Sequence, residues 1–593
     1  MSLMHPDLRP QAAHPLLTLS LLGAALLGAC SFAEAPEGPS VMNECARADQ
    51  CVSGVCDAEH AICIEPRSEP MRVGVEVLPA SDPGGGTPVR STFPEIDVAS
   101  PLGLDLPLQA RMTIVGDLRY QGAVVPADLT FVRESRFAAG PSTRTRTSTF
   151  AEPTRAEDGS LADFSVGVVA ADTYQVEVQP TGEAIRRLPP LQVQVTTGDA
   201  DLGRIDLTYP ESLAEPCAGP TSTGCTLTGQ VLSLLPDGTR EAEDGLQVRA
   251  VEIDSGRTVS STAITGASSL DLSLLAGAFE LVIAPGATPF VFVVTAGEGR
   301  PLFPTVSADP ALFFPGETPR ILVPRLTPVR YVAQVEDGRA QPVGGATIDF
   351  SSSDVFDETL QLGGSFRTSA ETLAASSLEA DAGALDPDAG RFEVDLLPGT
   401  YDVVITPSGD DLGIFVGRLV VVPSDTPVNG MVFVVPDRSR LGGSIETEDA
   451  RPVAGAMVRA TPLTNHLERP ESQHNRTSEA QTDATGRFDL PLDVGCYDLT
   501  IRPLEGTAFP WIVAPDLRFV DADVIYEDHF RVLLPVPLEG TVTSPDGAPM
   551  AGAEIRAYAI LEGDTAQPRT VQIGEAISGE DGRYLLLLPP RLQ

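Results

Sequence analysis

Apolar and polar residues alternate in four short segments spread along most of the chain. Each segment begins with an aromatic residue, carries apolar side chains at every second position after it, and reaches a proline six positions later. Alternation with a period of two predicts a β-strand buried on one face, and the proline marks where ladder pairing stops. The segments are residues 174–180, 279–285, 401–407 and 497–503.

Two further motifs recur in a constant order. One is glycine-arginine-aromatic just after an acidic residue, as in a tight turn that leads into a strand. The other is a proline followed, three positions later, by glycine-alanine. The first motif stands at 390–392, 486–488 and 582–584, and the second begins at Pro342, Pro452 and Pro549. The repeat of about 95–120 residues predicts an all-β chain of tandem β-sandwiches, each with its own core.

This order of motifs resembles the carboxypeptidase regulatory-like domain. The resemblance implies transthyretin-like, seven-stranded Greek-key β-sandwiches. It is closest over 328–536, recognisable over 537–593, and carried over 67–210 mainly by the strand at Tyr174. The expected sandwiches are 67–210, 211–327, 328–437 with an insertion near 351–389, 438–536, and an incomplete fifth at 537–593.

The linkers and the end of the chain give two expectations about assembly. Short connections near 327–328 and 436–437 predict an elongated array of independent sandwiches. After Gly582 only 11 residues remain, so three of the seven expected strands are missing from the fifth sandwich. We expect 537–593 to be frayed, to pair with a donor strand from another chain, or to reflect a truncated reading frame.

The insertion in the third repeat allows two interpretations. Thr368 and Glu371 have capping-box spacing, which predicts a short surface helix. A flexible insertion is the alternative.

The first residues have the pattern of an export signal. An apolar run near the N-terminus ends in Leu27-Gly28-Ala29-Cys30. The whole run is too short to cross a bilayer, so residues 1–29 are predicted to be a signal peptide. The four residues 27–30 resemble a bacterial lipobox, which implies cleavage before Cys30 and acylation of that residue. Ser31 then favours the outer membrane or cell surface over the inner membrane. The alternative is an ordinary signal peptide with a chance cysteine at position 30.

The remaining cysteines agree with an oxidising compartment. Residues 30–66 form the lipidated N-terminus and a cysteine-rich module in which four cysteines predict two disulfides, with an interleaved pairing favoured among three connectivities. A fifth and a sixth cysteine bracket a polar loop and predict a third disulfide. Cys496 is expected to be a packed thiol rather than a nucleophile. The predicted disulfide cysteines are Cys45, Cys51, Cys56, Cys63, Cys217 and Cys225.

Composition excludes several classes of protein. The 40 basic residues are all arginine, so a phosphate-binding loop with its lysine and Schiff-base chemistry are excluded. A net charge of −42 excludes the basic face of a nucleic-acid-binding protein. No histidine begins a zinc-protease motif, and His466 and His474 are expected to be solvated loop residues. No catalytic residues, metal or cofactor are predicted.

The sequence favours a non-enzymatic, lipid-anchored protein of the bacterial cell envelope, a tandem β-sandwich stalk for scaffolding or adhesion. Its expected partners are the membrane, through the lipid, and an envelope protein or polysaccharide. An array of carbohydrate-binding modules with a starch-binding-like fold is the alternative. In that case Trp511 is the ligand contact to test, against the interpretation that it is a core residue. A hydrolase with a cryptic site is the third hypothesis.

Overall fold

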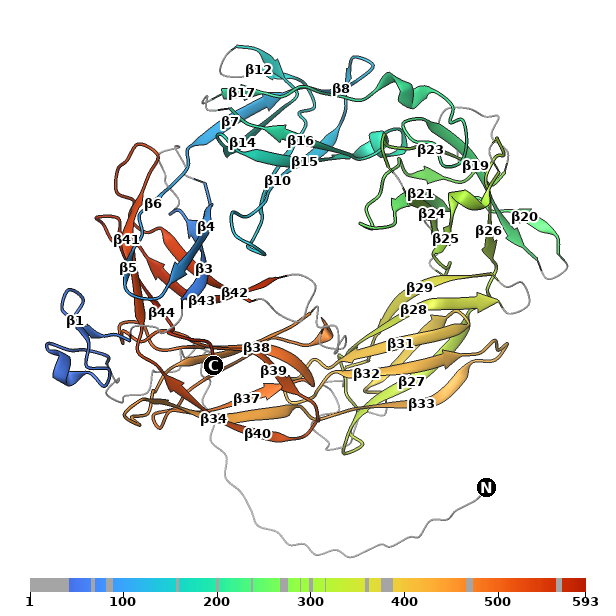
Figure 1. Ribbon diagram of the computed structural model, residues 1–593. Helices are drawn as coiled ribbons and strands as arrows, with labels where there is room; N and C mark the ends of the chain where they lie inside the picture. Colours follow the sequence, from blue (N-terminus) through green and yellow to red (C-terminus); the bar gives the residue numbers. More distant parts are fainter. Residues whose placement is uncertain are drawn as a thin grey trace, which may run out of the picture.

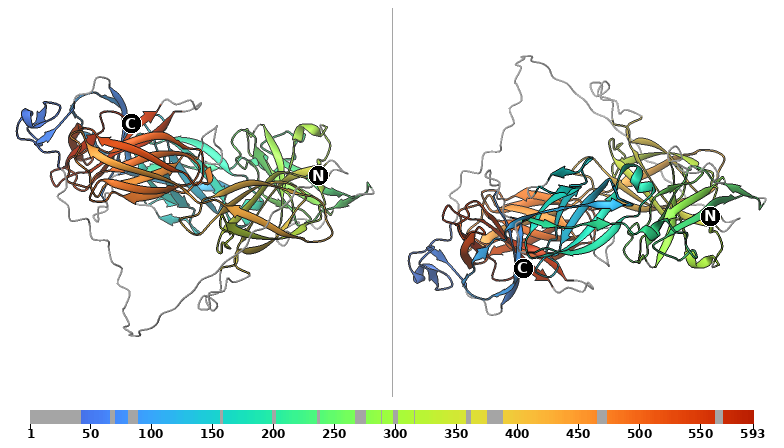
Figure 2. Two further views of the ribbon diagram at one scale, coloured as in Figure 1. Left: turned by 90° about the horizontal axis from the view of Figure 1, so that it is seen from below. Right: turned by 90° about the horizontal axis from the view of Figure 1, so that it is seen from above.

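Five β-sandwiches follow one another around a closed ring in the computed structural model (Figure 1). Figure 2 shows the ring edge-on, with the cysteine-rich module projecting at one margin. The structure describes residues 42–65, 70–80, 89–155, 159–198, 202–235, 238–266, 276–287, 289–297, 302–314, 316–357, 362–374, 388–464, 473–561 and 568–593. The helical segments within these ranges are short 3-10 helices, and none is long and apolar enough to cross a bilayer. They are Ala48–Gln50, Gly182–Arg186, Glu211–Ala214 and Pro310–Leu312. The predicted all-β fold of tandem sandwiches is confirmed.

The third and fourth sandwiches display the complete repeat. Each packs a three-stranded sheet on a four-stranded sheet, and its last strand runs parallel to its first. In the third the sheets are β30 (Arg391–Leu396), β27 (Val329–Asp337), β33 (Val428–Val435) and β29 (Leu362–Glu371), β28 (Thr347–Asp357), β31 (Gly399–Thr406), β32 (Phe415–Val421). In the fourth they are β37 (Arg487–Leu492), β34 (Ser439–Thr447), β40 (Ile525–Val532) and β36 (Ser478–Gln481), β35 (Met457–Pro462), β38 (Gly495–Arg502), β39 (Ile512–Phe519).

The glycine of the glycine-arginine-aromatic motif has one role in all three repeats. Gly390, Gly486 and Gly582 have φ values of 74°, 74° and 75°, in the left-handed region. A β-carbon at each would lie 2.6 to 2.7 Å from a backbone carbonyl oxygen of the first strand of its sandwich. Only glycine satisfies both conditions, so the motif fixes the turn into the next strand.

The first and second sandwiches vary this plan. In the first, the sheets are β11 (Thr143–Ser148), β10 (Ala127–Arg133), β15 (Thr173–Pro180), β16 (Leu191–Thr196); β14 (Phe164–Val169), β7 (Arg111–Gly116), β17 (Leu202–Arg204); β18 (Leu207–Thr208), β8 (Leu118–Tyr120), β9 (Ala123–Val124); and β12 (Thr154–Arg155), β13 (Leu161–Ala162). In the second they are β20 (Arg240–Ala242), β19 (Thr226–Leu234), β23 (Ala278–Val282) with β26 (Arg320–Pro324) beside β19, and β22 (Ala263–Ile264), β21 (Gln247–Glu252), β24 (Phe290–Thr295), β25 (Val306–Ala308).

The fifth sandwich is built from both ends of the chain. Blue N-terminal and red C-terminal strands share its sheets in Figure 1. One sheet is β4 (Ser91–Val98), β3 (Met71–Leu78), β42 (Glu554–Leu561), β43 (Arg569–Ile577), and the other is β44 (Arg583–Leu588), β41 (Val536–Thr543) with β5 (Leu102–Gly103) and β6 (Leu106–Pro107). Val73, Val75 and Val77 are fully buried in a core shared with Ile555 and Leu586.

This arrangement corrects three expectations. Residues 71–107 complete the fifth sandwich rather than begin the first. The strands missing after Gly582 therefore come from the same chain, and neither a foreign donor nor a frayed end is needed. Since this pairing joins the two ends, the sandwiches form a ring and not an elongated array.

The register shows that the donated strands occupy the ordinary places of the repeat. Val77 lies opposite Ile555 in the fifth sandwich, as Ile405 lies opposite Ile348 in the third. Strands β5 and β6 run parallel to β41, as β33 runs parallel to β27. The fifth sandwich is thus a regular repeat whose first four strands, β41 to β44, come from the end of the chain and whose remaining strands, from β3 onward, come from its beginning.

The surface helix predicted near Thr368 is wrong. Residues Leu362–Glu371 form β29, which pairs with β28 over nearly its whole length, because the ladder satisfies more backbone groups than a single helical turn would. Residues 375–387 of the insertion lie outside the described ranges.

Candidate functional site

Cavities and buried polar clusters lie at the junctions between neighbouring sandwiches. A cavity of about 620 Å³ lies between the first and second sandwiches, and one of about 520 Å³ between the second and third. A third, of about 690 Å³, lies where the last residues of the chain meet the fourth sandwich and the cysteine-rich module. Domain interfaces are frequent places for ligand sites, so each junction is a candidate site.

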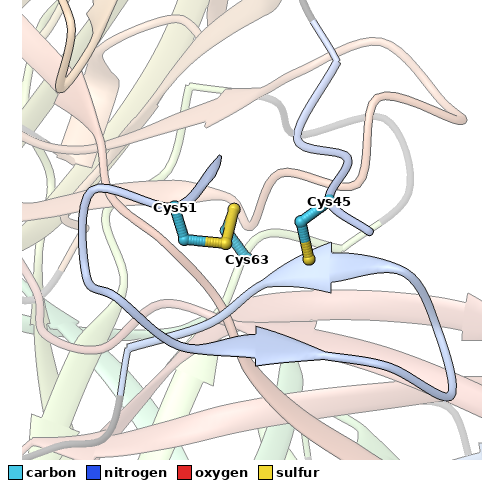
Figure 3. Close-up of side chains that lie close together, drawn as sticks. All are labelled: Cys45, Cys51 and Cys63. Atoms are coloured by element: carbon cyan, nitrogen blue, oxygen red, sulfur yellow. A yellow bond between two sulfur atoms is a disulfide. The ribbon is translucent and has the colours of Figure 1, made fainter. Parts of the chain in front are cut away.

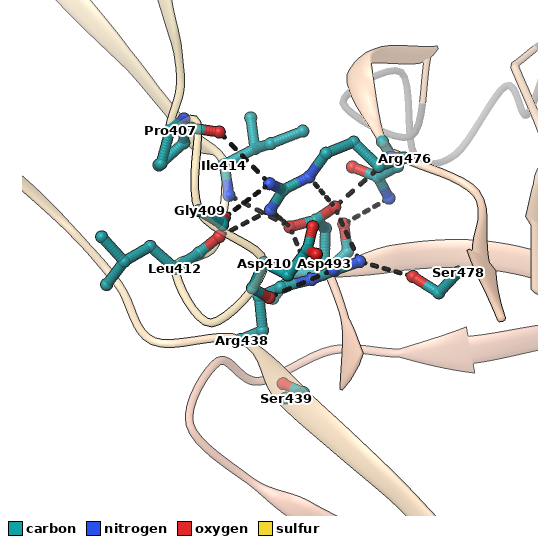
Figure 4. Close-up of polar contacts among 12 residues, drawn as sticks. Pro407, Gly409, Asp410, Leu412, Ile414, Arg438, Ser439, Arg476, Ser478 and Asp493 are labelled. Atoms are coloured by element: carbon teal, nitrogen blue, oxygen red, sulfur yellow. Dashed lines mark hydrogen bonds and ion pairs between the residues drawn. The ribbon is translucent and has the colours of Figure 1, made fainter. Parts of the chain in front are cut away.

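The junction of the third and fourth sandwiches contains a buried ionic cluster (Figure 4). Asp493 accepts hydrogen bonds from Arg476 Nη2 at 2.9 Å and from Arg438 Nη2 at 3.4 Å. The side chains of Arg438 and Asp493 are only 4% and 2% exposed. Burial lowers the pKa of the Arg438 guanidinium, and the charge of Asp493 opposes that shift.

The same cluster ties the two sandwiches together. Arg476 of the fourth sandwich donates to the carbonyl oxygens of Leu412 at 2.6 Å and Gly409 at 3.2 Å in the third. Asp493 in turn accepts a hydrogen bond of 3.1 Å from the Ile414 amide. The cluster contains one hydroxyl, that of Ser478, which accepts a hydrogen bond of 2.6 Å from Arg438 Nη2. The arginine donors are directed at Asp493, at this hydroxyl and at backbone carbonyls, so the role of the cluster is to fix the junction.

The junction of the fifth and first sandwiches is aromatic and ionic. The Phe137 ring of the first sandwich lies 5.8 Å from the Tyr558 ring and covers Gly74, where a β-carbon would meet it at 2.3 Å. Beneath it Glu76, fully buried, pairs with Arg90 and Tyr558. Both ends of the chain therefore take part in the contact with the first sandwich.

Trp511 lies at the junction of the fourth and fifth sandwiches. It is half-buried and packs against the core of the fifth sandwich. The Arg502 guanidinium carbon lies 3.9 Å from the centre of its ring, a cation–π contact. Because a guanidinium occupies one face of the ring, a sugar would have only the remaining exposed surface to contact.

The cysteine-rich module has interleaved disulfides. Figure 3 shows one of them, Cys51–Cys63, with Cys45 beside it. Cys45 is bonded to Cys56, and Cys51 to Cys63, around a hairpin of β1 (Cys56–Asp57) and β2 (Ile62–Cys63). The sulfur atoms of Cys45, Cys51 and Cys63 lie within 4.8 Å of one another. Sulfur atoms in disulfides are not thiolates, so this group is not a metal site.

The module docks where the ring closes. The backbone N–H of Asn43 donates to the Thr507 carbonyl oxygen at 2.9 Å, and the backbone N–H of Glu65 donates to the Pro535 carbonyl oxygen at 3.2 Å. The His60 ring lies 2.8 Å from the Asp57 carboxylate and 3.2 Å from that of Glu539 in β41. The module therefore holds the start of the chain against the last two sandwiches.

The other predicted residues are placed separately. Cys217 and Cys225 form a disulfide beside the cavity between the first two sandwiches. Cys496 is a fully buried thiol outside these disulfides. His474 is exposed, with its ring 3.0 Å from the Gln473 amide. Cys30 and His466 lie outside the described residues.

Comparisons with known proteins give weak likenesses. No protein-family model matches the chain, and no curated protein matches its sequence. The Bacillus anthracis TIE protein is similar at 12% identity, with 69% of each chain covered and a TM-score of 0.15. A streptococcal ancillary pilin shows 11% identity over 54% of this chain and 98% of its own, with a TM-score of 0.19. BcpA, the major pilin subunit of Bacillus cereus, shows 8% identity over 55% of this chain and 98% of its own, with a TM-score of 0.14. TM-scores this low carry no argument about what the chain does.

Sequence reasoning missed the residues that close the ring, although a signal was present. Residues 73–79 carry valine at every second position and then Pro79, which is the recurring strand motif with Val73 in the aromatic place. The expected first sandwich, 67–210, was also longer than any later unit. The clusters at Asp493 and Glu76 had no such signal, because no local sequence pattern indicates that an isolated charged residue is buried.

Proposed function

We propose that this chain is a non-catalytic, lipid-anchored protein of the bacterial cell envelope whose ring of β-sandwiches serves as a scaffold or adhesion platform. The observation that carries the proposal is that buried polar groups join neighbouring parts of the ring. Asp493, Arg438 and Arg476 join two sandwiches, and Glu76 with Tyr558 joins the two ends of the chain. These groups are engaged with one another, which suits a structural role better than a reaction centre.

Export and anchoring are supported by the cysteines. Three disulfides require an oxidising compartment. Cys30 follows the apolar run in the context of a lipobox, and acylation there would supply the membrane attachment. The proposed location is the outer membrane or cell surface.

Anchoring is tested by metabolic labelling with an alkyne-bearing fatty acid in cells that express the full chain. The wild type should incorporate label and fractionate with membranes, and Cys30→Ala should do neither. Cys496→Ala is the matched control, since that thiol is buried, and it should label like the wild type. Label retained by Cys30→Ala would contradict the proposed anchor.

The structural role is tested by crosslinking the intact chain in its native envelope and identifying the attached molecules. A recurrent envelope protein or polysaccharide at one face of the ring is expected. Turnover of a peptide or glycoside substrate by the purified chain would contradict the non-catalytic assignment and support the hydrolase hypothesis.

Saccharide binding is a second candidate function. The support for it is the cavity between the second and third sandwiches, whose lining is rich in hydroxyl groups and includes Arg367 and Asp402.

A further inference from the structure

The cavity between the second and third sandwiches has the size and place of a small-ligand site. Its volume of about 520 Å³ lies within the range of about 300–1,000 Å³ that such sites occupy, and it lies at a domain interface. Its lining differs from that of most such sites because hydroxyl and charged side chains outnumber apolar ones. A polar ligand is therefore indicated.

The floor of the cavity is a row of polar side chains across the four-stranded sheet of the third sandwich. Ser351 of β28 lies opposite Arg367 of β29 on one side and Asp402 of β31 on the other. Neighbours in register share one face of a sheet, so these three side chains stand together on the outer face. Arg418 of β32 continues the row beyond the cavity, with its Nε 3.3 Å from Asp402 Oδ1.

The row offers both kinds of hydrogen-bonding group. Arg367 is exposed, and a guanidinium carries five N–H donors. Asp402 supplies acceptors, and Ser351 can donate or accept. The register of β28 shifts just after Ser351, a β-bulge of the kind that is common beside functional sites.

The opposite wall belongs to the second sandwich and is held firmly. Thr305 exchanges two backbone hydrogen bonds with Ser365 of β29, at 2.6 and 2.8 Å. A β-carbon on Gly364 would lie 2.5 Å from the Thr305 carbonyl oxygen, so glycine is needed for this close approach. Phe303, half-buried, adds an aromatic ring to the lining.

We propose that this junction binds a neutral oligosaccharide. Sugar hydroxyls both donate and accept hydrogen bonds, which matches the alternation of Arg367, Ser351 and Asp402, and the Phe303 ring gives an apolar surface for the C–H face of a sugar. The net charge of −42 repels anionic ligands, which favours a neutral saccharide. This inference rests on the second candidate function and not on lipid anchoring.

The test is saturation-transfer NMR and calorimetry on the full purified chain with four probes: cellohexaose, maltohexaose, laminarihexaose and chitohexaose. At least one should bind in the millimolar range or tighter. Arg367→Ala and Asp402→Ala should each weaken it about tenfold, since each removes hydrogen bonds to the sugar. Both side chains are exposed, so the fold should be retained, which a thermal melt of each variant checks.

Two control variants make the result specific. Arg330→Ala removes an exposed arginine from the other sheet of the same sandwich, outside the cavity, and should leave affinity unchanged. Trp511→Ala should also leave it unchanged, because Trp511 lies at another junction. The proposal is overturned if none of the four probes binds, or if binding survives both cavity variants or is lost in Trp511→Ala. None of these outcomes bears on labelling at Cys30, so failure here is distinguishable from failure of the anchored scaffold.

Discussion

The Tyr558 hydroxyl donates a hydrogen bond of 2.8 Å to the Glu76 carboxylate across 482 positions of sequence. Glu76 is fully buried and also pairs with Arg90, as a charged group in a core must. Burial and the charge of Glu76 raise the pKa of Tyr558, which keeps its proton available for donation. The two ends of the chain thus meet through a specific polar contact as well as through apolar packing.

Val75→Asp is expected to open the ring. Val75 is fully buried opposite Ala557, and a carboxylate there would have no partner. The fifth sandwich should lose about 3–5 kcal/mol of stability, the cost of an uncompensated buried charge. Hydrogen exchange should show that β3 and β42 lose protection together, although they lie at opposite ends of the sequence.

The control for this variant is Ile577→Asp in the same sheet. Ile577 is 63% exposed, so this change should alter stability by no more than about 0.5 kcal/mol. Loss of protection in β3 alone, with β42 unaffected, would contradict a shared sandwich.

Paired cysteines at 77 and 555 should crosslink within one chain. Val77 and Ile555 are opposite one another, and β-carbons of such pairs are about 4.5–5.5 Å apart. Oxidation of the double variant should give a monomer that migrates differently from its reduced form on a denaturing gel. A covalent dimer as the main product would show that the strands are exchanged between chains, and each single variant serves as a control.

Asp493→Asn should weaken the junction of the third and fourth sandwiches. The change keeps the shape of the side chain but leaves the buried Arg438 without its counter-charge, at a cost of about 3–5 kcal/mol. Asp489→Asn is the matched control, because Asp489 is 55% exposed where it pairs with Arg440 and should contribute about 0–1 kcal/mol. Equal urea midpoints for the two variants would contradict a structural role for Asp493.

The cysteine-rich module should lose stability in acid through Asp57. Partial burial disfavours the ionised carboxyl, but hydrogen bonds from the His60 ring and the Glu59 amide outweigh burial and lower the pKa of Asp57 below 3.8. A folded pKa below the unfolded value gives stability that is present above the unfolded pKa and lost as the pH falls through the folded one. Amide exchange in the module should therefore be slower in the wild type than in Asp57→Asn near neutral pH, and the difference should vanish well below pH 3.8.

Asp49→Asn supplies the comparison for the acid experiment. Asp49 is 69% exposed, and its contact with Arg47 at 3.5 Å is solvent-screened. Its exchange rates should follow the wild type at every pH. A difference between wild type and Asp57→Asn that persists in strong acid would contradict the linkage to Asp57.

The repeat was predictable from sequence wherever the same structural constraint requires the same residue in each unit. Gly390, Gly486 and Gly582 are forced by a left-handed turn against a carbonyl oxygen, so they recur and can be recognised. Tyr401 and Tyr497 are fully buried in the strand that the alternation predicted.

The closure of the ring was harder to predict, because the fifth repeat has Val73 where the others have an aromatic residue. Alternation gives the face that a strand buries but not its partner, so β3 was assigned to the sandwich that follows it in sequence. The junction at Asp493 depends on contacts among segments that no local pattern connects.

Because β3 belongs to the same sheet as β42, the order of synthesis runs against the order of assembly. Residues 71–107 leave the ribosome, and cross any export channel, before the residues that will pair with them. Among the strand pairings of the described residues theirs has the longest sequence separation, which makes it a slow step of folding. Until the last strand arrives, an unpaired valine-rich edge is open to aggregation, so folding should depend on holdase chaperones in proportion to how long the C-terminal strands are delayed.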